Sequence, residues 1–200
     1  MVVVPELAVD ALRHEMQRIG TLVRRMLRMT LAGADAQALA HEQGASTRLF
    51  GAAQKFVQRM NRAEMVPATA ANVAESLREL RYYESAAEQA LQAALASVLP
   101  DAQIAEAYAL FERRSLALLD TIEAADRKHE VANDDSALIE SLSQSMEAAY
   151  GALKAQLLQA GAAGTLAISA MEEGLRRQSA LRRALQQVAK AHSRALTFAD

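Results

Sequence analysis

The sequence predicts an all-α protein built from two tandem antiparallel bundles of three long helices each. Three observations support this fold class. Apolar residues recur every three or four positions from end to end of the chain, which is the period of an amphipathic helix. Aromatic residues make up only 4 %, and 8 Gly and 3 Pro leave few places to turn, so the composition suits long helices better than sheets. The order of segment lengths and breaks also repeats in the second half of the chain.

The first half contains three predicted helices, at about residues 5–31, 35–63 and 68–98. Each break coincides with turn-forming residues: "AGAD" follows the first helix, "MVPA" the second and "LPD" the third. The predicted apolar faces are Leu12, Met16, Ile19, Val23 and Met26; Leu39, Leu49, Ala53, Phe56 and Met60; and Val73, Leu77, Leu80, Ala87, Leu91, Leu95 and Val98. Because the connections are short, neighbouring helices should be antiparallel.

The second half repeats this pattern, with helices predicted at about residues 101–130, 135–159 and 165–198 and with breaks at "ANDDS" and "GAAG". The predicted apolar faces are Ile104, Tyr108, Phe111, Leu118, Ile122 and Ala125; Ile139, Leu142, Met146, Tyr150, Leu153 and Leu157; and Ile168, Met171, Leu175, Leu185 and Ala189. The string "ESLREL" in the third helix corresponds to "EGLRRQ" in the sixth. We therefore predict a degenerate tandem duplication, with one three-helix repeat over residues 1–99 and a second over residues 100–200.

Composition and charge disfavour several classes of function. The net charge is −2 and the basic residues occur as pairs among acids rather than as a stripe, which does not favour nucleic-acid binding. Without Cys the chain has no disulfide, thiol nucleophile or thiolate metal site. The 4 His lie on different predicted helices, with no Ser or Asp beside them in a catalytic arrangement. No apolar run reaches the roughly 18 residues of a membrane span. We expect a protein that is not an enzyme and that functions in the cytoplasm.

An acid interrupts the predicted apolar face of the third helix. At about 100° per residue, Glu84 falls in the middle of that face, and a carboxylate placed there must be protonated, paired, hydrogen-bonded or bound to a metal. Folding the second helix back about Val66 brings Glu42 opposite Glu88. The three carboxylates Glu42, Glu84 and Glu88 are therefore predicted to converge, and such a cluster suits a hard divalent cation or iron.

Arginines offer an alternative that needs no metal. Arg24, Arg25 and Arg28 are predicted to lie near the level of Glu42, and Arg78 and Arg81 lie within a turn of Glu84. An arginine–carboxylate network would satisfy the acids with no cofactor. In the second repeat the matching positions are Arg182 and Gln186, where we expect an arginine that is paired with an acid or extends toward solvent.

Tyr82 faces away from the apolar face of the third predicted helix. It is therefore a candidate contact for a protein partner.

The tandem three-helix order, with the acid step Glu84-Ser-Ala-Ala-Glu88 in the third helix, resembles the PhoU family of phosphate-signalling proteins. Relatives in that family carry acidic metal clusters on paired helices, so the resemblance implies the same region as a site. The sequence "RYYESAAEQ" keeps two acids four residues apart but departs from the family's usual Glu-Arg-Ile-Gly-Asp pattern, and Arg182 and Gln186 replace the acids in the second repeat.

The opening "VPELAVDALRHEMQRIGTLVRRMLRMTLAG", with Glu15 on the first helix, is similar to the segment that follows the last membrane span of bacterial sodium/phosphate cotransporter-like proteins. The resemblance implies a PhoU-like regulatory domain at the cytoplasmic face of the inner membrane. Its partners would be the membrane portion of a transporter or phosphate-signalling proteins, and it could form a homodimer. Three alternatives stay open: a stand-alone PhoU-type adaptor, an acidic metal-cluster protein, and a helical scaffold that resembles PhoU by convergence.

Overall fold

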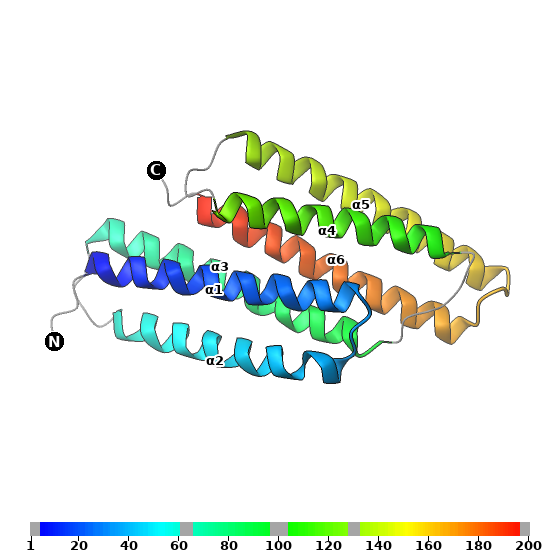
Figure 1. Ribbon diagram of the computed structural model, residues 1–200, viewed down its shortest axis with the longest axis horizontal. Coiled ribbons are helices and arrows are strands. Elements are labelled where there is room, and N and C mark those ends of the chain that lie inside the picture. Colours follow the sequence, from blue (N-terminus) through cyan, green and yellow to red (C-terminus); the bar gives the residue numbers. More distant parts are fainter. Residues whose placement is uncertain (1–4, 61–65, 97–103, 128–132, 197–200) are drawn as a thin grey trace.

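The computed structural model describes residues 5–60, 66–96, 104–127 and 133–196. The helices in this part of the chain are α1 (Pro5–Leu31), α2 (Ala36–Met60), α3 (Pro67–Ala94), α4 (Ala105–Arg127), α5 (Asn133–Ala162) and α6 (Ile168–Leu196). Each helix runs antiparallel to the one before it, with α1–α3 in one bundle and α4–α6 in the other (Figure 1). The predicted all-α fold class is confirmed.

The helix ends follow the turn chemistry of the sequence where the structure describes them. Gly33 (φ 89°) and Gly164 (φ 72°) adopt the left-handed conformation just after α1 and α5, a conformation that glycine reaches without strain from a Cβ. The Asp35 carboxylate accepts a 2.8 Å hydrogen bond from the Ala38 amide at the start of α2, which is an N-cap. Pro67 is the first residue of α3. Val98 and the predicted breaks around residues 99–101 and 132–136 lie wholly or partly outside the described residues.

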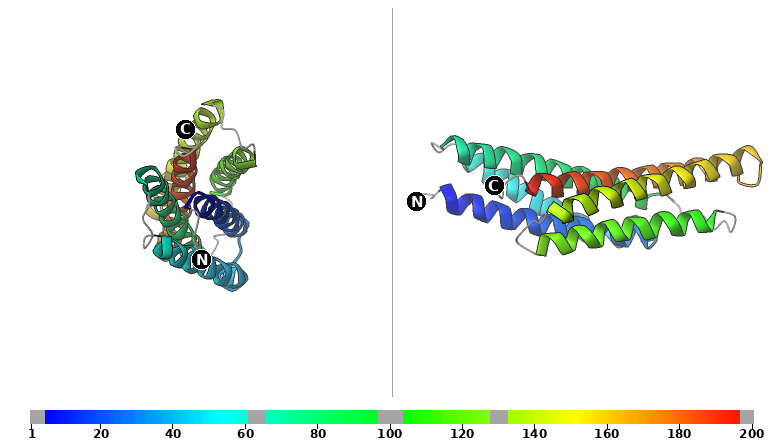
Figure 2. Two further views of the ribbon diagram at one scale, coloured as in Figure 1. Left: turned by 90° about the vertical axis from the view of Figure 1, so that its left-hand side faces the viewer. Right: turned by 90° about the horizontal axis from the view of Figure 1, so that it is seen from above.

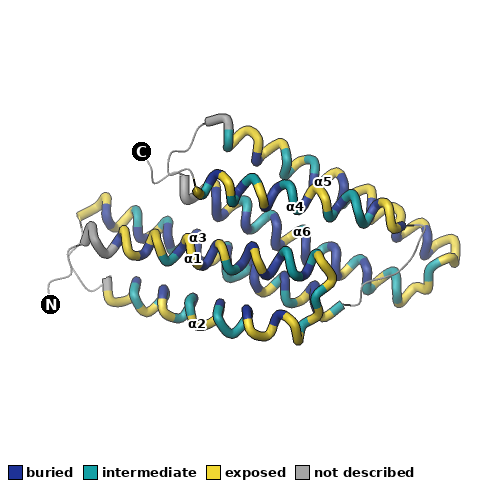
Figure 3. The backbone as a smooth tube through the Cα atoms, in the orientation of Figure 1, coloured by how far each residue is buried: buried dark blue, intermediate teal, exposed yellow. Residues whose placement is uncertain are grey.

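One hydrophobic core, to which all six helices contribute, joins the two bundles (Figures 2 and 3). The most extensive helix–helix contact in the described part is between α3 and α6, which come from different bundles. Buried alanines are frequent on both helices, among them Ala86, Ala90 and Ala93 of α3 and Ala180 and Ala184 of α6. Small side chains allow the helix axes to approach closely. The boundary predicted between residues 99 and 100 lies outside the described residues, so the division into two repeats stays a prediction.

The buried face of α3 is rotated from the one that we predicted. Leu77 and Leu91 are only half-buried, and Leu95 is 69 % exposed. The buried residues of α3 are Thr69, Val73, Ser76, Glu79, Leu80, Tyr83, Ala86, Ala87, Ala90, Ala93 and Ala94. The physical reason is that α3 contacts α1, α2 and α6, so several of its sides face protein and many of its alanines are buried. The predicted face of large apolar residues at one helical period therefore covers only part of this buried surface.

Arg177 of α6 anchors the ends of two helices. Its guanidinium donates hydrogen bonds to the carbonyls of Ala93 (2.7 Å) and Ala96 (3.2 Å) at the end of α3, and to the carbonyl of Thr30 (2.5 Å) near the end of α1. These carbonyls lie where a helix leaves its acceptors unsatisfied and where its dipole favours a cation. Arg177 therefore fixes α6 against the C-terminal ends of α1 and α3.

Gly20 marks a close contact between α1 and α3, and Gly20→Ala should destabilise the protein. A Cβ at this position would lie 2.7 Å from the hydroxyl oxygen of Tyr83 and 2.9 Å from its Cζ, and Tyr83 is buried. We expect a loss of roughly 1–3 kcal/mol in the free energy of unfolding, measured by urea denaturation. Gly151→Ala is the matched control, because nothing lies within 4 Å of its Cβ and alanine favours a helix by about 0.5–1 kcal/mol. Equal effects at both sites would contradict the close contact.

Candidate functional site

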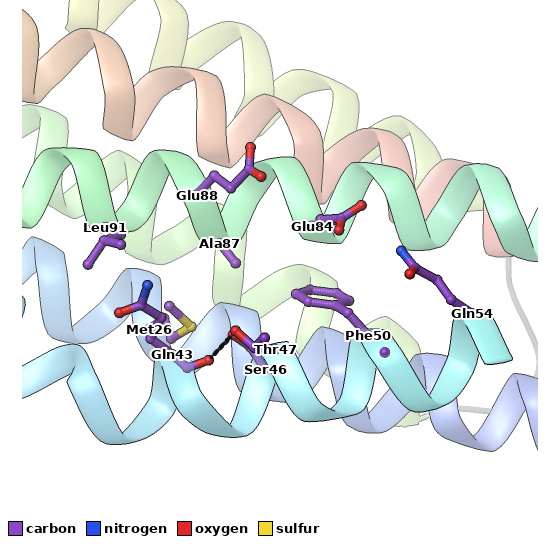
Figure 4. A pocket seen from close by; sticks show the side chains of 11 residues that line it. Met26, Gln43, Ser46, Thr47, Phe50, Gln54, Glu84, Ala87, Glu88 and Leu91 are labelled. Carbon is purple, nitrogen blue, oxygen red and sulfur yellow. Dashed lines mark hydrogen bonds between the residues drawn. The ribbon is translucent and has the colours of Figure 1, made fainter.

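Glu84 and Glu88 line a groove of about 410 Å³ between α2 and α3. Figure 4 shows the ring of Phe50 and the amide of Gln54 on the α2 side of this groove, while the carboxylate of Glu88 points away from α2. Glu84 is half-buried with a side chain 31 % exposed, and it lies 3.8 Å from Arg81. Glu84 therefore lies at the edge of the packed surface of α3. The prediction that it lies in the middle of this surface is wrong. The reason is the rotation of α3 described above.

Glu42 does not join the other two carboxylates at this groove. It is buried beneath α1, where its Oε1 lies 3.1 Å from Nη2 of Arg25. In the described part of the chain, no three His, Asp or Glu side chains are grouped so that they could hold a metal ion. The predicted convergence of three carboxylates is thus wrong in its geometry, because α2 presents Glu42 toward α1. The alternative of arginine partners holds for Glu42 and for Glu84.

The other two arginines predicted near Glu42 pair instead with α4 of the second bundle. Arg28 lies 2.6 Å from Asp120 and 2.8 Å from Glu123. The charge of Arg28 is therefore used to hold the two bundles together. Arg24 also reaches α4, but at a buried site.

Arg182 and Gln186, the counterparts of Glu84 and Glu88 in the second repeat, both bind Glu147 of α5. The distances are 3.2 Å from Arg182 Nη1 and 2.6 Å from Gln186 Nε2 to the carboxylate. The guanidinium of Arg182 also lies 4.9 Å from the ring centroid of Tyr150, within the range of a cation–π contact. The predicted acid-paired arginine is confirmed here.

We expect the purified protein to hold no stoichiometric iron, manganese or zinc. Glu42 and Glu84 have arginine partners, and tightly held ions such as structural zinc take about four protein ligands. Mass spectrometry of protein purified without chelator measures the metal content, and a melting curve with and without EDTA measures its effect on stability. One metal ion per chain that is lost in Glu84→Ala would contradict this expectation.

Tyr82 is half-buried and packs against the hydrophobic core. Its role as a partner contact stays a prediction. The next residue, Tyr83, is fully inside the molecule.

A buried polar cluster lies where α1, α3, α4 and α6 meet. It consists of Arg24, Glu79, Tyr83, Asp126 and His192, and we refer to it as the polar junction. Arg24 Nη1 lies 2.7 Å from Asp126 Oδ2, and the other oxygen of that carboxylate lies 2.8 Å from Nδ1 of His192. Arg24 and His192 are buried, while the side chain of Asp126 is 22 % exposed. The junction joins two helices of the first bundle to two of the second.

Burial and neighbouring charges in the polar junction shift the pKa values of Asp126 and Glu79. Burial would raise the pKa of Asp126, but the hydrogen bond from His192 and the charge of Arg24 outweigh burial and lower it. Asp126 is therefore ionised, and Nδ1 of His192 carries the proton that it donates. Burial raises the pKa of Glu79 to about 8, and the charge of Asp126 adds to this effect against the opposing charges of Arg13 and Arg24. Glu79 is therefore mostly protonated at neutral pH.

The sequence contained a signal for part of this junction. His192 falls seven residues after Leu185, and Asp126 falls four residues after Ile122, so both continue predicted apolar faces. A titratable residue on such a face is a candidate buried group. What the sequence lacked was the pairing between helices that are far apart along the chain.

The six helices and their arrangement in two bundles define a PhoU-like fold. The crystal structure of the phosphate transport system regulatory protein PhoU from Streptococcus pneumoniae matches with a TM-score of 0.76, over 97 % of this chain and 96 % of that chain, at 16 % sequence identity. At this identity the likeness establishes the fold alone. No protein-family model and no curated protein matches the sequence.

None of the helices in the described part of the chain is both long enough and apolar enough to cross a membrane.

Proposed function

We propose that this protein is a non-enzymatic regulator that acts in phosphate transport, or in its control, through contacts with other proteins. The observation that carries the proposal is the match in fold, over nearly the whole chain, to a protein named as a regulator of a phosphate transport system. Ion pairs within and between the bundles support it, because they hold the helices in a fixed arrangement. This arrangement suits a rigid module that is recognised by its surface.

Deletion of the gene in its host tests the proposal. Uptake of radiolabelled phosphate is measured in cells starved of phosphate and again after phosphate is restored. We expect the deletion strain to keep a high uptake rate after restoration, and a plasmid copy of the gene to reverse the defect. Identical uptake in the two strains under both conditions would refute the proposal.

Two settings for such a regulator remain, and one measurement separates them. In the first, the chain is the cytoplasmic domain of a sodium/phosphate cotransporter-like membrane protein, which the similarity of its opening segment supports. In the second, it is a stand-alone PhoU-type adaptor. Immunoblots of fractionated host cells decide between them: a larger band in the membrane fraction supports the transporter domain, whereas a band at 21.6 kDa in the soluble fraction supports the adaptor.

A further inference from the structure

A groove of about 760 Å³ lies over α6, between the end of α3 and α5. In the described part of the chain, α3 and α5 both pack against α6 but do not contact each other. The strip of α6 that lines the groove lies between these two helices, and Figure 1 shows α6 passing between α3 and α5. Arg176 and Arg183 lie two turns apart on this strip, a distance of roughly 10 Å along the helix.

The described residues that line this groove carry an excess of positive charge. Lys154, Arg176 and Arg183 all line it and are exposed, and none of them forms an ion pair with another described residue. Glu173 is the acid among its lining residues. The chain as a whole has a net charge of −2, so this concentration of cations is local. We refer to this surface as the basic groove.

Apolar surface accompanies these cations. Leu95 lies at one wall of the basic groove and is 69 % exposed. Tyr150 lies at the opposite wall, where the guanidinium of Arg182 is held 4.9 Å from its ring centroid. The cations are exposed and lie beside apolar side chains, so the surface offers both positive charge and apolar contact. The combination fits an amphipathic segment whose apolar side chains are flanked by carboxylates.

We propose that the basic groove docks an acidic amphipathic helix of a partner protein. The proposal deepens the proposed function and rests on it, since a regulator without catalytic chemistry acts through contact. Its test is a binding measurement on the purified chain. Failure of that test is therefore distinguishable from a failure of the phosphate-uptake experiment.

The test uses a fluorescent peptide designed as an acidic helix, with Leu at the i, i+3, i+4 and i+7 positions and Glu on either side. Binding to the full chain is followed by fluorescence anisotropy. We expect saturable binding that weakens as salt is raised, and a loss of at least about tenfold in affinity in the triple variant Lys154→Glu, Arg176→Glu, Arg183→Glu. Leu95→Ser should weaken binding without changing the salt dependence.

A matched control comes from α2, where Arg48, Lys55 and Arg59 are equally exposed and lie on one helix. Reversing these three charges changes the net charge by the same amount and should leave the affinity within about twofold. Circular dichroism verifies that both triple variants are folded. Four results would overturn the proposal: no saturable binding, equal losses in the two triple variants, equal binding of a scrambled peptide of the same composition, or displacement of the peptide by millimolar inorganic phosphate.

Discussion

Asp126→Ala should lower the free energy of unfolding by about 3 kcal/mol, because it leaves the buried guanidinium of Arg24 without its ion-pair partner. Arg24 lies 2.7 Å from Asp126 with only 4 % of its side chain exposed, and His192 loses the acceptor of its 2.8 Å hydrogen bond. The expected cost is therefore that of an uncompensated buried charge. Urea denaturation followed by circular dichroism at 222 nm measures it.

Asp120→Ala provides the matched control on the same helix. Asp120 also pairs with an arginine of α1, Arg28, at 2.6 Å, but its side chain is 66 % exposed. Exposed pairs contribute little, so we expect a loss of less than about 1 kcal/mol. Adding Arg24→Met to Asp126→Ala should recover part of the lost stability, since the unpaired charge is then removed. A loss in Asp126→Ala no larger than that in the control would show that the polar junction does not stabilise the fold.

Glu79→Gln should change how stability depends on pH. The pKa of Glu79 is raised from 4.5 to about 8 in the folded state, so between these two values the folded protein binds a proton that the unfolded chain does not hold. Stability from this group is fully present below the unfolded pKa and is lost as pH rises through the folded pKa. The wild type should therefore lose on the order of 4 kcal/mol relative to Glu79→Gln between pH 4.5 and 8.5.

The measurement is a series of urea denaturation curves at half-unit steps of pH for both proteins. Glu88→Gln is the control, since Glu88 is exposed on the same helix, and its curve should parallel that of the wild type. Asp126→Asn adds a second test, because the charge of Asp126 contributes to the raised pKa of Glu79. In that variant the folded-state pKa of Glu79 is lower, so the loss of stability should be complete at lower pH and smaller in total. A pH profile of Glu79→Gln that parallels the wild type would contradict the assignment.

The polar junction also bears on how the two bundles are held together. Arg24 and Glu79 come from the first bundle, whereas Asp126 and His192 come from the second. Arg28 adds two more ion pairs between α1 and α4, and Arg177 ties α6 to the ends of α1 and α3. Polar contacts of fixed geometry thus set the register of the bundles across the alanine-rich contact of α3 and α6. Apolar contacts alone would specify this register less sharply.

At the candidate site, the sequence predicted the arrangement of residues on one helix but not the arrangement of residues on different helices. Glu84 and Glu88 do line one groove, because they lie four residues apart on one helix and this spacing is local. The direction in which Glu42 points depends on how α2 is rotated about its own axis. In the structure this rotation places its carboxylate beside Arg25. Glu79 of α3 is buried. It lies outside the predicted face of large apolar residues, so the sequence pattern did not indicate its burial.

The sequence by itself determined the helices, their order and their antiparallel arrangement. Period, proline, glycine and N-cap residues act within a few positions, so α1 begins and ends at the predicted residues 5 and 31, and the other helix ends fall within four residues of prediction. Tertiary structure alone decided which side of α3 is buried and which acids Arg24 and Arg28 bind on α4. The reason is that these outcomes depend on contacts between residues as far apart as Arg24 and Asp126, and several pairings of similar charge are compatible with one pattern of helices.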